Sequence, residues 1–381
     1  MKKASLFIVF CILTVFCVEG IHASESSIKK EGWGKLSDGT EVDLYTLKNE
    51  TGMTVQVSNY GGLIVSLTVP DKNGKSEDVV LGFDSLEDYL QEGVPYFGAL
   101  IGRYGNRIAN GEFKIGEQTY HVTRNENGIT SLHGGKSGFD KKIWKVKELQ
   151  SDEALGLLLT YTSPDGEEGF PGNLDVTVCY FIAKKSNDLL ILYGAKTDKV
   201  TPINLTQHTY FNLRGAGKGT ILDHVLSINA EEITPVDKNL IPTGELMKVE
   251  GTPFDFRSPT KIGERIGADH EQIKLGGGYD HNWVLNRSKE ELRLAATVYD
   301  PESGRKLEVR TLEPGLQFYT GNILDGSLKG KGGISYQKHF GFCLETQHFP
   351  DSPNKEDFPC TFLSPGDLYQ TATSFHFSIH K

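Results

Sequence analysis

Apolar and polar residues alternate one for one along several short stretches of this chain. Residues 53–58, 174–180 and 306–310 all follow this pattern. Successive side chains of a β-strand point to opposite faces, so strict alternation places one set in a core and the other toward solvent. The pattern therefore predicts half-buried β-strands in widely separated parts of the chain.

Turn-forming residues separate the alternating stretches. The predicted turns lie at residues 38–39, 73–74, 164–166 and 313–315. Asn, Asp and Gly tolerate the positive φ that tight hairpins need, and the chain has 43 glycines. A helical pattern is limited to residues 85–90, with Ser85 as a candidate N-cap. No linker or repeat divides the chain, so we expect an all-β fold: one large antiparallel β-sandwich domain over residues 24–381, with few short helices.

The first 23 residues have the order of a secretory signal. Two lysines precede an apolar run over residues 6–18, and small residues follow up to Ala23. The run is shorter than the roughly 20 residues that a membrane span needs. We expect cleavage after Ala23 and export to the periplasm or the medium. A lipid anchor on Cys17 is the alternative, although Phe16 stands where a small residue is expected.

Charge and cysteine content exclude two classes of protein. The formal net charge is −10 without a compensating run of Lys and Arg, so nucleic acid is not an expected partner. Beyond residue 23 the chain has Cys179, Cys343 and Cys360, an odd number without close spacing, which argues against a disulfide framework. A chain of this length buries a core without such cross-links. Nothing in the sequence sets an oligomeric state, and a monomer is our expectation.

Five segments concentrate polar functional groups among glycines and aromatic residues. They are residues 102–108, 131–135, 204–213, 276–283 and 341–347. Taken singly, each has an ordinary structural explanation: His208 as a hydrogen-bonded core histidine, Asp280 as a turn cap, or Glu345 on a solvated strand face. Only folding can bring these distant segments together, so spacing alone does not define a site.

Metal and cofactor motifs are weak or missing in the sequence. His208 and His281 are possible zinc ligands, but there is no His-Glu-x-x-His or paired-cysteine spacing. A glycine-rich phosphate loop and a serine nucleophile elbow are also lacking. We therefore expect neither a metal nor a cofactor.

In this order, the five segments resemble the signatures of the aldose 1-epimerase family, also called galactose mutarotases. The matching motifs are Asn106-Arg107-Ile108, Leu132-His133-Gly134-Gly135, Asn204-Leu205-Thr206 with His208, Tyr210-Phe211-Asn212-Leu213, Gly278-Tyr279-Asp280-His281-Asn282, residues 314–322 and Leu344-Glu345-Thr346-Gln347. The resemblance runs from about Gly32 to the C-terminus. One departure is Tyr104-Gly105, where many members have other residues before the Asn-Arg pair.

The resemblance implies a fold, a reaction and a set of site residues. The fold is a large galactose mutarotase-like β-sandwich with an open sugar site. The reaction interconverts the α and β anomers of free hexoses of the glucose and galactose class, by acid–base ring opening and reclosure without a cofactor. By motif, Glu345 is the base and His208 the acid. The sugar-contacting positions fall on Asn106, Arg107, His133, Asp280 and Gln317.

Three other functions fit part of this residue set. A glycoside hydrolase needs two carboxylates about 5–10 Å apart, for which Glu345 and Asp280 are candidates. A noncatalytic sugar-binding sandwich would use the same polar groups only to hold hydroxyls. An epimerase of hexose 6-phosphates is closer still, but an exported chain would rarely meet that substrate. The sequence does not rank glucose, galactose and pentoses as substrates.

Overall fold

The computed structural model describes residues 26–380 of the chain. The predicted signal, its cleavage point at Ala23 and the candidate anchor Cys17 lie outside the described residues. Strands dominate the structure, and the α-helices are short: α1 (Leu86–Tyr89) and α2 (Glu271–Gly276). No helix within residues 26–380 is long and apolar enough to cross a membrane.

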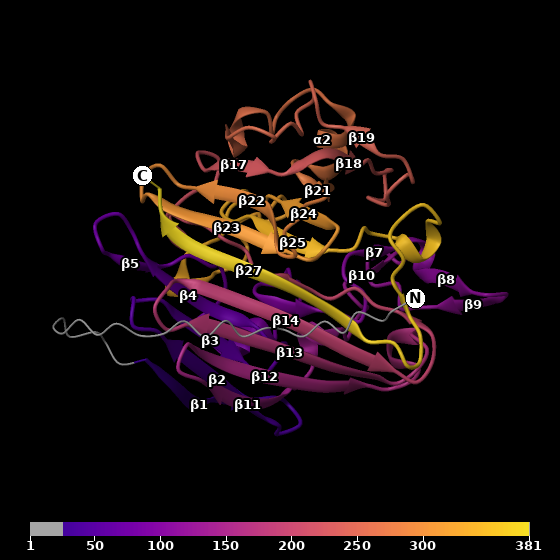
Figure 1. Ribbon diagram of the computed structural model, residues 1–381, viewed down its shortest axis with the longest axis horizontal. Helices are drawn as coiled ribbons and strands as arrows, with labels where there is room; N and C mark the ends of the chain where they lie inside the picture. The colour runs from indigo at the N-terminus through magenta and orange to yellow at the C-terminus, as the bar shows by residue number, and fades with distance from the viewer. Residues whose placement is uncertain (1–25, 381) are drawn as a thin grey trace.

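Three antiparallel sheets build the molecule (Figure 1). The first is a five-stranded meander of β1 (Ser27–Lys35), β2 (Glu41–Lys48), β3 (Thr54–Ser58), β4 (Ile64–Pro70) and β5 (Ser76–Asp78). The second has nine strands in the order β11 (Lys145–Gln150), β12 (Ala154–Ser163), β13 (Leu174–Ala183), β14 (Asp188–Thr197), β27 (Tyr369–Ile379), β23 (Arg305–Thr311), β22 (Arg293–Tyr299), β17 (Val225–Ile228) and β20 (Thr260–Lys261). The third has the order β19 (Met247–Lys248), β18 (Ala230–Thr234), β21 (Asp280–Leu285), β24 (Gly315–Tyr319) and β25 (Cys343–Gln347).

The C-terminal strand joins the two halves of the nine-stranded sheet. Figure 1 shows β27 crossing the middle of the molecule, between β14 and β23. One apolar cluster draws on all three sheets, with Val55 from the first, Val178 from the second and Phe318 from the third. The shared core confirms the predicted large antiparallel β-sandwich with few short helices.

Two pairs of short strands hold the loops that carry the polar segments. Strand β6 (Ala99–Ile101) pairs with β16 (Thr206–His208), and β7 (Arg107–Ile108) pairs with β10 (Ser131–Leu132). Two further two-stranded pairs are β8 (Glu112–Ile115) with β9 (Gln118–His121), and β15 (Thr201–Pro202) with β26 (Phe362–Leu363).

The alternating stretches form strands as predicted. Along β13 and β23, buried residues alternate with more exposed ones. Ser85 caps α1 by accepting a hydrogen bond from the backbone N–H of Asp88, as expected for an N-cap. The three cysteines beyond residue 23 are all free thiols.

One predicted turn glycine has a different role. Gly315 begins β24, so it is part of a strand rather than of a tight turn. A Cβ atom at this position would lie 2.3 Å from Oδ1 of Asn282 and 3.0 Å from the carbonyl oxygen of Gln347. Glycine is favoured there because a larger residue would displace the Asn282 side chain and crowd the backbone of Gln347.

Candidate active site

All five polar segments reach one pocket of about 850 Å³. Six of the seven predicted site residues line it: Asn106, Arg107, His133, His208, Asp280 and Glu345. The seventh, Gln317, lies behind Asp280, and its Nε2 donates to Oδ1 of that carboxylate at 2.7 Å. The structure therefore places the predicted residues together, with Gln317 positioned to orient Asp280 rather than to line the pocket.

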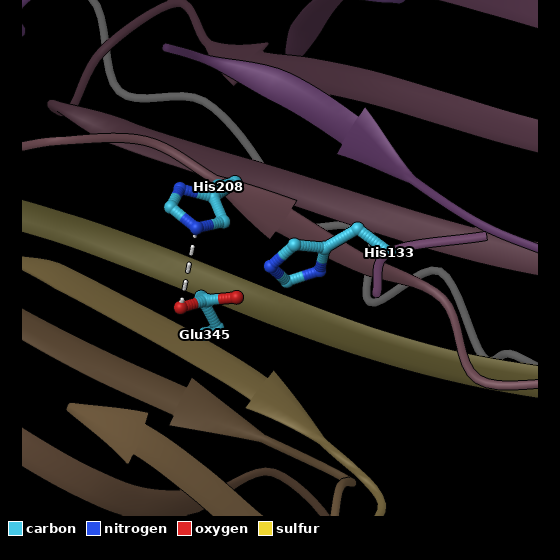
Figure 2. Close-up of side chains that lie close together, drawn as sticks. All are labelled: His133, His208 and Glu345. Atoms are coloured by element: carbon cyan, nitrogen blue, oxygen red, sulfur yellow. Dashed lines mark ion pairs between the residues drawn. The ribbon is translucent and has the colours of Figure 1, made fainter. Parts of the chain in front are cut away.

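The two proposed catalytic groups face each other across the floor of this pocket. Glu345 lies in the middle of β25 and His208 ends β16, and Nε2 of His208 is 3.7 Å from Oε1 of Glu345 (Figure 2). Glu345 is only 2% exposed and His208 only 4%. Such a buried pair can exchange protons with a small molecule bound between or beside the two groups, out of reach of bulk water.

Burial favours the neutral form of both groups. It raises the pKa of Glu345 well above its usual value; the negative charge of Asp280 adds to this shift and Arg107 opposes it. Burial also lowers the pKa of His208 to about 4. Burial therefore opposes an ion pair between the two groups. Charge on Glu345 depends on cations and hydrogen-bond donors that face it.

Strand pairing explains how Asn106, Arg107 and His133 meet although 25 or more residues of chain separate the loops. In the β7–β10 pair, Leu132 stands opposite Arg107. The backbone N–H of His133 donates to the carbonyl of Asn106, and the N–H of Asn106 donates to Nδ1 of His133 at 3.2 Å. Gly134 has φ +87°, and a Cβ there would lie 1.9 Å from the carbonyl oxygen of Gly102, so only glycine permits this approach.

Arg107 is anchored between two carboxylates. Its Nε and one terminal nitrogen both donate to Glu126 at 2.8 Å, and the same terminal nitrogen lies 3.8 Å from Oδ2 of Asp280. Glu126 also accepts a hydrogen bond from the hydroxyl of Thr130. The bidentate contact fixes the plane of the guanidinium, so its charge stays directed at the pocket.

The donor set of the pocket superficially suits a metal ion. Ligand atoms of His133, His208 and Glu345 all lie within 4.8 Å of one another, a two-histidine, one-carboxylate group. However, Nδ1 of His133 accepts from the Asn106 backbone, and burial lowers the pKa of His133 well below its usual value. The neutral ring therefore carries its hydrogen on Nε2, which makes that nitrogen a donor rather than a ligand. The group fits a sugar oxygen better than a metal.

The alternative zinc pair, His208 with His281, is not brought together as a ligand set. His281 is fully buried; its Nδ1 accepts from the backbone N–H of Asp280, and its Nε2 lies 3.1 Å from Oε1 of Gln272. Both ring nitrogens therefore have protein partners, and the Nε2 contact joins β21 to α2.

Sequence reasoning missed Tyr96 and Glu126. Tyr96 adopts φ +59°, and its ring centroid lies 4.6 Å from that of His133 and 5.7 Å from that of His208. A bulky residue at positive φ is uncommon and often marks a functional position. The Pro95-Tyr96-Phe97-Gly98 segment was a usable signal, whereas nothing local distinguishes Glu126 from other surface carboxylates. The aromatic residues Trp283 of β21 and Phe318 of β24 are core residues with no exposed surface.

Comparison with known proteins adds an independent line of evidence. A sequence family described as aldose 1-epimerase matches residues 43–376. The galactose mutarotase of Bos taurus is 46% identical over 354 residues, which cover 93% of this chain and 99% of the relative. The aldose 1-epimerase of Escherichia coli (strain K12) is 39% identical over 343 residues, which cover 89% of this chain and 96% of the relative.

Solved structures agree with these relatives. The galactose 1-epimerase of Lactobacillus acidophilus NCFM superimposes with a TM-score of 0.82 at 29% identity, covering 94% of this chain and 100% of that one. An aldose epimerase homologue from C. elegans gives a TM-score of 0.79 at 28% identity, with the same coverage. The similarity therefore extends over nearly the whole described chain rather than one motif.

Proposed function

This chain belongs to the aldose 1-epimerase family, and on that premise we propose that Glu345 and His208 are the base and the acid with which it interconverts the α and β anomers of free aldoses. The observation that carries this proposal is the 3.7 Å approach of two buried proton-transfer groups on the floor of the pocket. Hexoses of the glucose and galactose class are the proposed substrates, since galactose is named in several relatives.

Ring opening needs two proton transfers. Glu345 removes the proton of the C1 hydroxyl, the C1–ring oxygen bond breaks as the C1 carbonyl forms, and His208 protonates the departing ring oxygen. Rotation about C1–C2 exposes the other face of the aldehyde. Reclosure reverses both transfers, so the enzyme returns to its starting state with atoms and charges balanced. Each positioned group contributes typically about 10²–10⁴-fold.

The productive pair holds one proton, located on His208. Because burial alone favours the neutral acid at Glu345, groups facing the carboxylate must counteract it. Arg107 is the facing cation, fixed by Glu126. The Nε2–H of His133 is available to donate to a sugar oxygen, and Asp280, oriented by Gln317, is available to accept from sugar hydroxyls.

Equilibration of freshly dissolved sugar tests the function. Polarimetry of α-D-glucose and α-D-galactose with purified protein should show accelerated approach to the equilibrium rotation. An aryl glycoside in parallel should release no aglycone. Sugar binding without acceleration would assign the pocket to a noncatalytic sugar-binding sandwich, and aglycone release would assign it to a hydrolase.

We further propose that the chain is exported, with residues 1–23 removed and residues 24–381 forming one domain. The support is the order of basic, apolar and small residues at the N-terminus. Intact-mass measurement of protein recovered from the periplasm or medium should give a chain beginning near Ser24. A diacylglyceryl adduct on Cys17 would replace cleavage after Ala23 by lipid anchoring.

A further inference from the structure

One face of the third sheet carries the active site, and this face extends one further row of residues beyond Glu345. Register places Asn282, Gln317 and Glu345 side by side on β21, β24 and β25. The next row along the same face has Gly315 opposite Gln347. Side chains two residues apart on a strand share a face, so Gln347 lies directly beyond Glu345 on the pocket side.

Unpartnered polar atoms gather on this face. Seven side-chain atoms there are buried and have no hydrogen-bond partner among residues 26–380: Thr206 Oγ1, Asn282 Oδ1 and Nδ2, Gln317 Oε1, Glu345 Oε2, and Gln347 Oε1 and Nε2. Asn282, Thr206 and Gln347 are at most 1% exposed. Thr206 belongs to β16, which packs against β25, and shares the strand face of His208.

Such a concentration points to water as the missing partner. Buried polar groups in folded proteins are almost always hydrogen-bonded, and buried waters bridge groups that find no protein partner. Both amides lack partners at the donor and at the acceptor end, so they can hold a water in either orientation. The only ionisable member of the set is Glu345, through Oε2, the oxygen that is not paired with His208.

We propose that Gln347 and Asn282 are positioning residues for the catalytic base: they order water against Oε2 of Glu345 and keep its carboxylate ionised for proton abstraction. This inference rests on the proposed role of Glu345. Oε1 then faces His208, while Oε2 accepts hydrogen bonds from the water that the two amides hold. A carboxylate that accepts hydrogen bonds holds a proton less tightly. Its pKa is therefore lowered, which offsets the rise in pKa that burial causes.

The other groups that face Glu345 stay the same when an amide is replaced. The charged or readily titrated ones are Arg107, His133, His208 and Asp280. The phenols of Tyr210 and Tyr319 and the thiol of Cys343 also lie near; burial raises the pKa of each, so they remain neutral across the assay range. The acid limb is the low-pH side of the pH profile of kcat/KM, where activity rises as the base loses its proton. A shift of this limb in an amide variant therefore reports the lost hydrogen bonds.

The test is the pH dependence of kcat/KM for α-D-glucose in Gln347→Met and Asn282→Leu, which preserve size and remove the amide. A hydrogen bond to a charged group contributes enough to move the apparent pKa of the base by about one unit or more. We expect the acid limb to move upward by that amount, whereas Asn282→Ser, which keeps a hydroxyl, should leave it close to the wild-type position. An unchanged limb in both amide-free variants would overturn the inference.

Gln207→Met is the matched control. Gln207 is 3% exposed and donates to the hydroxyl of Tyr180 from the opposite face of β16, so its loss removes a buried amide away from Glu345. We expect a lower melting temperature with an unmoved acid limb. A limb shifted equally in this variant would mean that general loosening, rather than water at Oε2, moves the profile.

Two further measurements complete the test. Glu345→Gln should abolish the acid limb in its residual activity; a persisting limb would remove the base assignment itself, separately from any result with the amides. If both amide-free variants fail to fold, a high-resolution crystal structure of the wild-type protein decides. Water bound to Oε2 and both amides supports the inference, and direct pairing of the amides without such water refutes it.

Discussion

Replacing Glu345 by Gln removes the proposed base while leaving the shape of the pocket floor. The side chain is 2% exposed, so bulk water has little room to substitute for the carboxylate. The amide oxygen can still accept a hydrogen bond from the C1 hydroxyl, but it does not remove its proton at neutral pH. The variant therefore isolates proton abstraction from sugar binding.

The expected loss follows from the role of the group. A positioned base contributes about 10²–10⁴-fold, so kcat should fall by at least about 10²-fold, or roughly 2.7 kcal/mol of barrier. KM should change little, because the interaction lost is one that forms in the transition state. Burial already favours the uncharged acid, so a neutral isostere should not destabilise the fold strongly.

Saturation-transfer NMR between the two anomeric protons of glucose measures the exchange directly, and a thermal melt checks the fold. Glu313→Gln is a matched control, since Glu313 is 1% exposed and pairs with His348 at 2.6 Å outside the catalytic pocket. It should lower stability and leave exchange near the wild-type rate. Near-normal exchange in Glu345→Gln would refute the assignment of this carboxylate as the base.

Three further outcomes are expected. His208→Asn should reduce kcat about as much as Glu345→Gln. The double variant should lose less activity than the product of the two single losses, because the two groups act as a unit. Losses that multiply fully in the same NMR assay would contradict this. Asp280→Asn should raise KM at least as much as it lowers kcat, measured by initial-rate polarimetry; an effect on kcat alone would place Asp280 in proton transfer. Activity should survive exhaustive dialysis against EDTA, because Nε2 of His133 carries hydrogen; loss restored by zinc would reassign the site.

The strands were predictable because their physics is local. Alternation along residues 174–180 depends only on the two faces of a strand, and β13 has that pattern of burial. The same holds for Ser85, whose capping hydrogen bond spans three residues. Gly315 was less predictable, because the side chain that crowds this position belongs to Asn282, in a different strand.

The site was predictable only through resemblance, since its geometry depends on long-range pairing. Nothing near Arg107 in the chain shows that Leu132 stands opposite it or that Glu126 fixes its guanidinium. Gln317 was predicted as a sugar contact from its motif alone, and its hydrogen bond to Asp280 on the neighbouring strand could not be foreseen. Motifs selected residues that the fold brings together, while the fold was needed to show which of them line the pocket and which contact a lining residue.

Strand periodicity, read together with burial, identifies the functional face without any resemblance. In β25 every residue is buried, although Glu345 and Gln347 are polar. The neighbouring Leu344 lies in the apolar core, so the polar set must face a second buried region. A solvated strand face would expose these side chains, and a core face would not tolerate an unpaired carboxylate. A buried carboxyl and a buried amide on the same face of a strand therefore mark a pocket. The sequence does not show the burial that separates this case from an ordinary surface strand.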